Sequence, residues 1–266
     1  TLPRAGNLGG GGFMLVYLKE KDEIFYIDYR SKSPLNSNLE NIFNISSSDG
    51  KKYEVVPKNF DTNKFDVLDT GYKASAVPGT VAGLLDAHAY FGRLELSEIL
   101  ASVIAQAKNG IVVSYDLHKA IESTPRLYDD IESRRLYFKN DSAIEENSIL
   151  KLPDLANTLS LISKNGKDGF YKGETTKKII EAMNNNGGLM KLEDFAQYKA
   201  EIRSPISTEY RGNKVFTAGP PSGGGITLLT ALNILSFFEL EKYKSPLGFL
   251  LKSFLSRAKS KVSRFF

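Results

Sequence analysis

The sequence has no cysteine, and this absence excludes several kinds of chemistry. A chain without thiols forms no disulfide, supplies no thiolate to a metal ion and has no cysteine nucleophile. The two histidines, His88 and His118, lack the His-x-x-x-His spacing that is typical of metal sites. A Gly-x-Ser-x-Gly motif, which would indicate a serine nucleophile, is also absent. We therefore predict no metal site and no cofactor.

Long apolar runs are missing as well, since no stretch approaches the roughly 20 apolar residues that span a bilayer. The first residues, Thr1-Leu2-Pro3-Arg4, include no initiator methionine and no apolar core of a signal peptide. We expect that the native N-terminus is missing, which leaves the compartment open. The net charge of +4 is small for 266 residues and does not indicate a nucleic-acid partner.

Basic charge is concentrated at the end of the chain. Between Lys242 and Phe266 the sequence has seven basic residues and no acidic one. Apolar residues such as Leu250 and Phe254 are interleaved with them, which is typical of a basic amphipathic helix. The interpretation we favour is an ordinary helix with a solvated basic face and a packed apolar face. Contact with an anionic membrane surface is the alternative.

Hydrophobic alternation predicts two strands near the start of the chain. Residues 13–17 and 24–30 are joined by a charged turn, as in a hairpin. The period of two in the second strand places Tyr26, Asp28 and Arg30 on one face. Such a polar face suits a strand that is packed on one side and faces a site on the other.

The rest of the chain alternates between polar segments and helical periodicity. Residues 31–75 are polar, with a short hairpin that ends near 53–56. A helix begins after Pro78-Gly79, with Thr80 as N-cap and Gly92 as stop. Helices are predicted at 97–108, 154–163, 174–183 and 226–235, with a hairpin over 206–218. The fold class is therefore α/β (α+β), with residues 1–266 forming a single domain that ends in the basic amphipathic helix 242–266.

Two glycine runs, Gly9–Gly12 and Gly223–Gly225, could bind an anion through backbone amides. Neither has the Gly-Lys-Ser/Thr ending of a P-loop, and neither fits a dinucleotide fingerprint. Close backbone packing is the simpler interpretation, because glycine leaves room that any side chain would fill. Arg30 follows the first run, and its planar guanidinium suits a carboxylate.

Several motifs occur in a defined order along the chain. They are Ala5–Met14 with Asp28-Tyr29-Arg30, Val77–Gly83, Phe170–Gly173, Asn186–Leu189 with Asp194–Lys199, and Pro220–Ile226 with Leu232–Leu235. In this order they resemble the γ-glutamyltransferases, a family of the N-terminal-nucleophile (Ntn) hydrolase superfamily. The resemblance covers nearly the whole chain and weakens after about Lys242.

The resemblance implies the large-subunit part of an αββα sandwich, incomplete at both ends. In this family a precursor cuts itself into two subunits, and the small subunit begins with a threonine that attacks the γ-glutamyl carbonyl. The nucleophile is then absent from this chain, and the partners are a small subunit and a small-molecule γ-glutamyl substrate. Arg30 corresponds to the arginine that holds the α-carboxylate of the γ-glutamyl group. Ser31 stands where the family usually has an acidic residue.

Two other interpretations stay open. One is a non-catalytic remnant or interaction protein of the same fold, which the absent nucleophile favours. The other is a component of a related Ntn acylase or amidohydrolase with a different acyl group. Thr227 and Thr230 fall inside a predicted helix and are not expected to act as nucleophiles.

Overall fold

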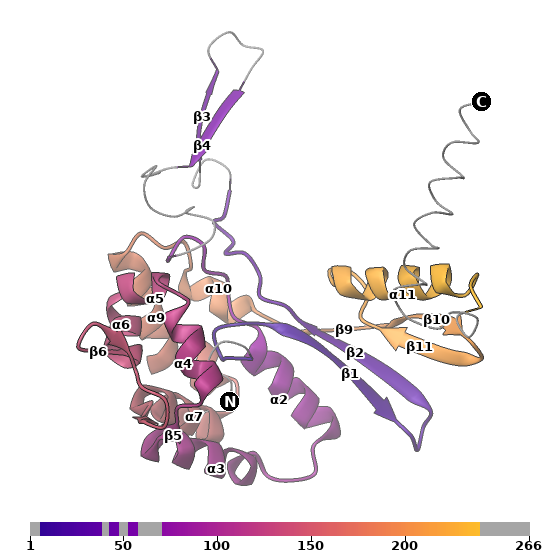
Figure 1. Ribbon diagram of the computed structural model, residues 1–266, viewed down its shortest axis with the longest axis horizontal. Helices are drawn as coiled ribbons and strands as arrows, with labels where there is room; N and C mark the ends of the chain where they lie inside the picture. Colours follow the sequence, from indigo (N-terminus) through magenta and orange to yellow (C-terminus); the bar gives the residue numbers. More distant parts are fainter. Residues whose placement is uncertain (1–5, 39–42, 48–52, 58–70, 240–266) are drawn as a thin grey trace. The chain divides into compact units, whose positions relative to one another are not determined.

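The computed structural model describes residues 6–38, 43–47, 53–57 and 71–239, and the chain divides into two compact units (Figure 1). Unit 1 comprises Thr1–Phe13 and Ile27–Glu201, and unit 2 comprises Met14–Tyr26 and Ile202–Phe266. The description of residues 1–266 as one domain stays a prediction. The predicted basic helix 242–266 lies outside the described residues.

The strands confirm the hairpins that alternation predicted. A three-stranded sheet has the order β1-β2-β9, and the other strands form the antiparallel pairs β3–β4, β5–β8, β6–β7 and β10–β11. The strands are β1 Gly12–Leu18, β2 Glu23–Tyr29, β3 Phe43–Ser47, β4 Tyr53–Pro57, β5 Ile111–Val112, β6 Phe138–Lys139, β7 Ser142–Ala143, β8 Ile149–Leu150, β9 Glu201–Arg203, β10 Ile206–Tyr210 and β11 Asn213–Thr217. The pairs β5–β8 and β6–β7 have no predicted counterpart, because two residues are too few to show a period.

The described helices lie mostly in unit 1 and include those predicted at 97–108, 154–163, 174–183 and 226–235 and the one predicted after Pro78-Gly79. They are α2 Thr80–Phe91, α3 Leu96–Asn109, α4 Tyr115–Glu122, α5 Arg126–Asp129, α6 Ile131–Tyr137, α7 Pro153–Asn165, α8 Asp168–Tyr171, α9 Glu174–Asn185, α10 Leu192–Gln197 and α11 Gly223–Leu235. Within the described ranges, none of them has the length and apolarity needed to cross a membrane.

The start of α2 differs by one residue from the prediction. Thr80 is the first helical residue, and Gly79 occupies the N-cap position without a side-chain hydrogen bond. The reason is that the Gly10 carbonyl accepts hydrogen bonds from the backbone amides of Gly79 (2.8 Å) and Thr80 (3.1 Å). A backbone carbonyl thus replaces the capping side chain that a helix N-terminus usually needs.

The core of unit 1 forms where α2, α7, α8, α9 and α10 meet, with α3 packed along α7. Its aromatic centre comprises Phe170, Tyr171, Phe195 and Tyr198, whose ring centroids lie 5.1 to 6.4 Å apart in the contacting pairs. Phe195 is almost completely buried. Rings of this size dominate core energetics, so these four residues hold together helices that are far apart in the sequence.

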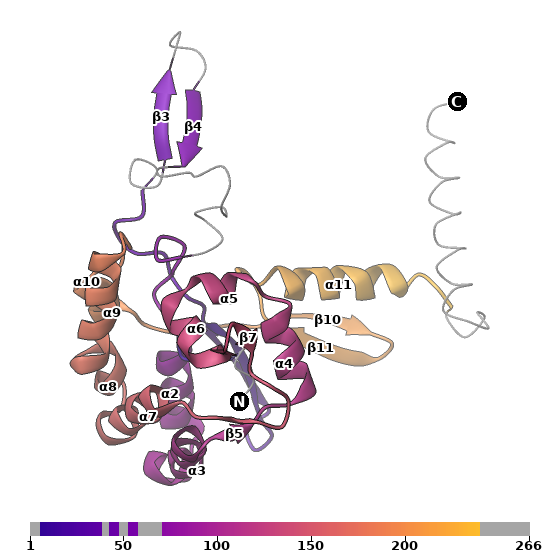
Figure 2. The ribbon, with the colours of Figure 1, turned by 60° about the vertical axis from the view of Figure 1, so that its left-hand side comes forward.

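In unit 2, α11 lies along the β10–β11 hairpin (Figure 2). The second glycine run forms the first turn of this helix, whereas the prediction began the helix at Ile226. Ser222 caps the turn by accepting a hydrogen bond from the Gly225 amide (3.4 Å). A Cβ at Gly225 would collide with the carbonyl of Ala218, so close packing, not helix propensity, explains the glycine.

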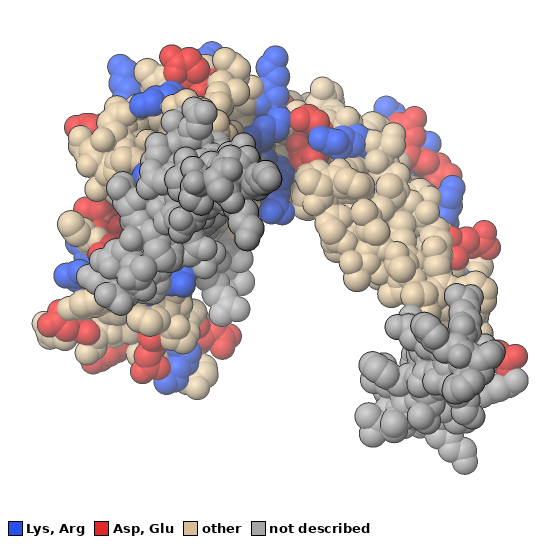
Figure 3. Space-filling model, turned by 90° about the horizontal axis from the view of Figure 1, so that it is seen from above, with Lys and Arg blue, Asp and Glu red and all other residues tan. Residues whose placement is uncertain are grey.

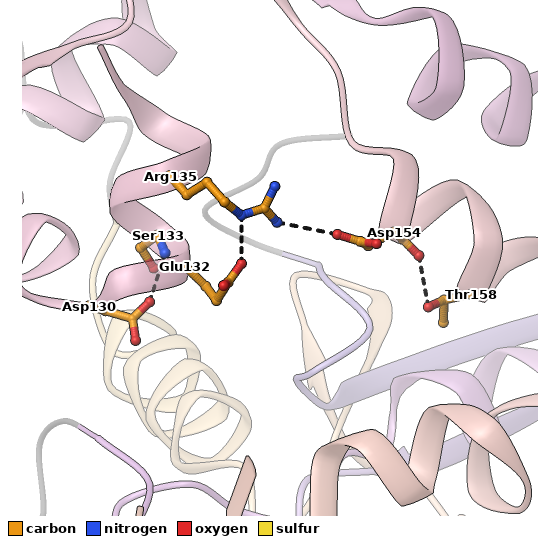
Figure 4. Close-up of polar contacts among 6 residues, drawn as sticks. All are labelled: Asp130, Glu132, Ser133, Arg135, Asp154 and Thr158. Atoms are coloured by element: carbon orange, nitrogen blue, oxygen red, sulfur yellow. Dashed lines mark hydrogen bonds and ion pairs between the residues drawn. The ribbon is translucent and has the colours of Figure 1, made fainter. Parts of the chain in front are cut away.

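Arg135 of α6 forms two ion pairs on the surface of unit 1, one within α6 and one to α7 (Figure 4). The Arg135 guanidinium contacts the carboxylates of Glu132 at 2.8 Å and Asp154 at 3.3 Å. All three side chains are more than half exposed. Pairs of this kind contribute about 1 kcal/mol or less, so they adjust the fold and do not determine it.

A buried carboxylate has a larger structural role. Asp194, at 5% exposure, accepts hydrogen bonds from the amides of Leu35 (2.7 Å) and Lys191 (2.6 Å). The second bond satisfies an amide at the start of α10, and the first fixes the chain that follows β2. One side chain therefore joins segments that lie 159 residues apart.

Replacing Asp194 by Ala should lower the free energy of unfolding by about 1–3 kcal/mol, because it leaves amides without an acceptor. Glu193→Ala is the matched control, since Glu193 is an exposed carboxylate in the same helical turn. Its effect should stay within about 0.5 kcal/mol. Urea unfolding of the chain measures both values, and equal effects would contradict the role assigned to Asp194.

Candidate functional site

Arg30 lies directly after β2, at the point where the chain leaves the sheet. Its side chain is exposed, and the guanidinium carbon lies 5.9 Å from the centroid of the Phe13 ring. Within the part of the chain that the structure describes, no carboxylate forms an ion pair with it. The guanidinium fork therefore remains available for an external carboxylate.

The backbone around Arg30 is held much more firmly than its side chain. The Arg30 amide donates to the carboxylate of Asp28 at 3.1 Å, and the Arg30 carbonyl accepts from the hydroxyl of Tyr198 at 2.8 Å. Two residues on, Lys32 exchanges both backbone hydrogen bonds with Val77, at 2.8 and 3.1 Å. An exposed cation thus projects from a fixed segment of main chain.

The alternation predicts that the polar face of β2 is open to a site. The structure contradicts this prediction, because the strand is covered on that face as well. Tyr26, Ile27 and Asp28 are each less than 10% exposed, so both faces of β2 are covered at its centre. The polar groups of this face are used internally, since Asp28 binds a backbone amide and the Tyr26 hydroxyl donates to the Gly219 carbonyl at 3.3 Å. Of the three residues placed on that face, only Arg30 is exposed.

The first glycine run packs against this segment. A Cβ at Gly11 would lie within 3.0 Å of three backbone atoms of Tyr29, Arg30 and Ser31. By contrast, Gly9 and Gly10 have ordinary van der Waals space. The prediction of close-packed backbone beside the arginine is therefore confirmed at Gly11.

A second close approach involves the start of α2. A Cβ at Gly79 would lie within 3.0 Å of the Tyr29 carbonyl and of the Tyr198 hydroxyl. The amides of Gly79 and Thr80 already donate to Gly10, so they are not available to a phosphate. The glycines of this region serve backbone packing around Arg30.

Tyr198 is itself buried, and two other side chains contact its ring. Its ring stacks on that of Tyr171, with centroids 5.7 Å apart and planes 5° from parallel, and Lys32 lies 5.5 Å from its centroid. Burial raises the pKa of both tyrosines well above its usual value. The Tyr198 hydroxyl therefore stays protonated and remains a donor to Arg30 at any physiological pH.

Comparison with known proteins identifies the family. Residues 1–250 match the family model described as gamma-glutamyltranspeptidase. The chain belongs to this family. The resemblance predicted from the ordered motifs is thereby confirmed.

Curated relatives and solved structures agree with this assignment. The chain is 34% identical over 245 residues to the glutathione hydrolase proenzyme of Escherichia coli, covering 91% of this chain and 40% of the relative. It matches the crystal structure of Helicobacter pylori gamma-glutamyltranspeptidase with a TM-score of 0.80 and 32% identity, over 93% of this chain and 68% of that one. The Pseudomonas nitroreducens enzyme complexed with L-DON gives a TM-score of 0.76 and 34% identity, over 92% and 68%.

These matches define what part of the fold is shared. The chain spans about 40% of the length of the curated relatives it matches. The mixed α/β structure corresponds to γ-glutamyltranspeptidase crystal structures over part of their chains. At this level the predicted fold class is confirmed.

The other candidate residues of this γ-glutamyltranspeptidase family member have structural contacts. The imidazole of His88 contacts the Leu94 carbonyl at 2.8 Å, and that of His118 contacts the Ile144 carbonyl at 2.9 Å. Among the described residues, no group of three or more His, Asp or Glu side chains could hold a metal ion. Thr227 and Thr230 lie in α11, as predicted, and the Thr227 hydroxyl donates to the Gly223 carbonyl at 3.0 Å.

Two residues around Arg30 had no role in the sequence-based prediction. Tyr198 belongs to one of the ordered motifs, and Asp28 belongs both to the arginine motif and to the polar face of β2, but neither is predicted to contact the backbone of Arg30. Tyr198 lies 168 residues from Arg30 in the chain, so no local pattern connects them. The sequence contains only an indirect signal, because Tyr198 and Arg30 belong to motifs of the same ordered series.

Introducing a side chain into the close approach should destabilise the protein. Gly11→Ala places a methyl group among backbone atoms, which cannot move aside as a flexible side chain can, and should cost about 1–3 kcal/mol. Gly9→Ala, in the same run, should be nearly neutral because its nearest contact is Asn7 Oδ1 at 3.5 Å. Chemical unfolding of both variants tests this, and equal losses would argue against a specific constraint at Gly11.

Proposed function

We propose that this chain is the large-subunit part of a γ-glutamyltransferase or glutathione hydrolase. Such an enzyme transfers a γ-glutamyl group from glutathione or a γ-glutamyl amide to water or an amino acid. Family membership and the names of the relatives support the reaction class. The observation that carries the proposal is the exposed guanidinium of Arg30 on a backbone fixed by Asp28 and Tyr198.

In this proposal Arg30 binds the α-carboxylate of the γ-glutamyl group through two parallel hydrogen bonds. Guanidinium geometry gives the substrate both an anchor and an orientation, which a point charge on lysine would not provide. The γ-carbonyl then faces the threonine of a small subunit, whose hydroxyl attacks while its own amino group acts as base. Backbone amides stabilise the oxyanion of the tetrahedral intermediate. Its collapse breaks the γ-glutamyl amide bond, and the donor amine leaves with the proton held by the threonine amino group. Water or an amino acid then attacks the acyl-enzyme, and the threonine hydroxyl is released with a proton from the attacking group.

A small subunit is also the proposed partner of unit 2. Helix α11 has no charged residue, and Ile226, Leu228 and Ile234 are each at least 36% exposed. Phe237, just beyond the helix, is 86% exposed. Figure 3 shows a broad area of this surface with neither basic nor acidic side chains. An apolar surface of this kind is typical of an interface, and covering it would complete the proposed αββα sandwich.

The chain by itself should show no turnover. Purified chain is incubated with a chromogenic γ-glutamyl anilide, first alone and then after co-production with a small subunit of the family. We expect release of the anilide only in the second case, because the nucleophile comes from the partner. Turnover by the chain alone would overturn the proposed division of the site.

Loss of the guanidinium should weaken substrate binding in the assembled enzyme. Arg30→Ala should raise KM for γ-glutamyl substrates about 10- to 100-fold, the range expected for a hydrogen bond to a charged group. Arg30→Lys should restore only part of this loss. Arg135→Ala, which removes an exposed arginine from α6, is the control and should leave KM unchanged. An unaltered KM for Arg30→Ala would favour a related acylase with a different acyl group.

A further inference from the structure

The Arg30 carbonyl is the point where the substrate-binding segment is tied to a distant part of unit 1. Its acceptor oxygen receives the hydroxyl of Tyr198 at 2.8 Å. Tyr198 directly follows α10, whose start is fixed by the buried carboxylate of Asp194. The position of Arg30 therefore depends on a rigid element 168 residues away in the sequence.

Three features prevent the Tyr198 hydroxyl from taking another position. The ring is 9% exposed and stacked in parallel on Tyr171, so rotation would break the stack. The hydroxyl occupies space that only a glycine at position 79 leaves free. The Lys32 ammonium lies near the ring and is itself held by the Lys199 carbonyl at 3.2 Å and Glu201 at 2.9 Å.

We propose that Tyr198 is a positioning residue for Arg30. The Tyr198 hydroxyl fixes the backbone of Arg30, so that the guanidinium meets the substrate carboxylate in one orientation. This inference rests on the proposed function. Tyr198 does not touch the substrate in this scheme. It acts through the main chain of Arg30. Removal of the Tyr198 hydroxyl would leave the guanidinium in place but without a fixed orientation.

The physical reason is that a long side chain amplifies small shifts at its Cα atom. Arg30 has no carboxylate of the described residues to orient its guanidinium, so its direction depends on the backbone and on the Phe13 ring. A two-point bond to a carboxylate tolerates little misalignment, and displacements near 1 Å are enough to weaken a site strongly. Loss of the carbonyl tether should therefore reduce binding more than the chemical step.

The kinetic test uses Tyr198→Phe in the enzyme assembled with its small subunit. The substitution keeps the ring and its stack but removes the donor. We expect KM for a γ-glutamyl anilide to rise about 3- to 10-fold with kcat changed less than twofold, as for one lost hydrogen bond. Replacing Tyr198 by para-aminophenylalanine, which supplies an N–H donor at the same position, should restore most of the binding.

Tyr171→Phe is the matched control. It removes a hydroxyl from the stacking partner, which donates to the Pro78 carbonyl at 2.8 Å and accepts from the Ala82 amide at 3.1 Å. Its loss should reduce stability at least as much as Tyr198→Phe, yet leave KM unchanged. If both variants raise KM equally, the effect of Tyr198 is one of general stability and the inference is wrong.

Hydrogen exchange of the same proteins provides a readout that does not depend on activity. Tyr198→Phe should accelerate exchange selectively at the amides of residues 30–32, whereas Tyr171→Phe should affect residues 78–83. Unchanged exchange at 30–32 together with an unchanged KM would overturn the positioning role. A different outcome would contradict the proposed function alone. In that case Arg30→Ala leaves KM unaltered, while Tyr198→Phe still accelerates exchange at residues 30–32.

Discussion

The site depends on a close meeting of main-chain segments that side chains would prevent. A Cβ at Gly11 would collide with the backbone of Tyr29, Arg30 and Ser31. A Cβ at Gly79 would collide with the Tyr29 carbonyl and the Tyr198 hydroxyl. These contacts bring together the glycine run, the end of β2 and the start of α2. Backbone atoms cannot move aside as flexible side chains do, so the packing defines one arrangement of the segment that carries Arg30.

In this arrangement the backbone of Arg30 is fixed, whereas its side chain is exposed to solvent. The main chain of Arg30 is hydrogen-bonded on both its amide and its carbonyl, while the guanidinium is exposed. Because the backbone of this cation is already ordered, binding of an anion has to restrict only the freedom of the side chain. The groups that hold this segment all belong to unit 1: Asp28 and Tyr198 bind the Arg30 backbone, and Val77 pairs with Lys32. The binding half of the proposed site is therefore built by the unit that carries the arginine.

The sequence predicted the parts of the fold that have a period. Helices α3, α7 and α9 and the β10–β11 hairpin follow from apolar spacing and turn residues, because local geometry repeats in the sequence. The helix α11 was predicted three residues too short, because Gly223–Gly225 are poor helix formers. Of these three, Gly225 is required by the close approach to the Ala218 carbonyl, a tertiary reason that no local pattern contains.

The candidate site also contains residues that a sequence pattern indicates and residues whose contacts depend on tertiary structure. Arg30 could be singled out because its residue type and neighbouring motif indicate a carboxylate ligand. The roles of Asp28 and Tyr198 could not, since one hydrogen bond is made by a side chain read as part of an open polar face and the other spans 168 residues. Sequence patterns thus single out the group that is proposed to bind a ligand, whereas the groups that are proposed to position it are seen only in the tertiary packing. The hydrogen bonds from Asp28 and Tyr198 end on backbone atoms of Arg30. Every residue type has a backbone carbonyl, and all except proline have an amide, so the identity of the residue that they hold does not reveal these bonds.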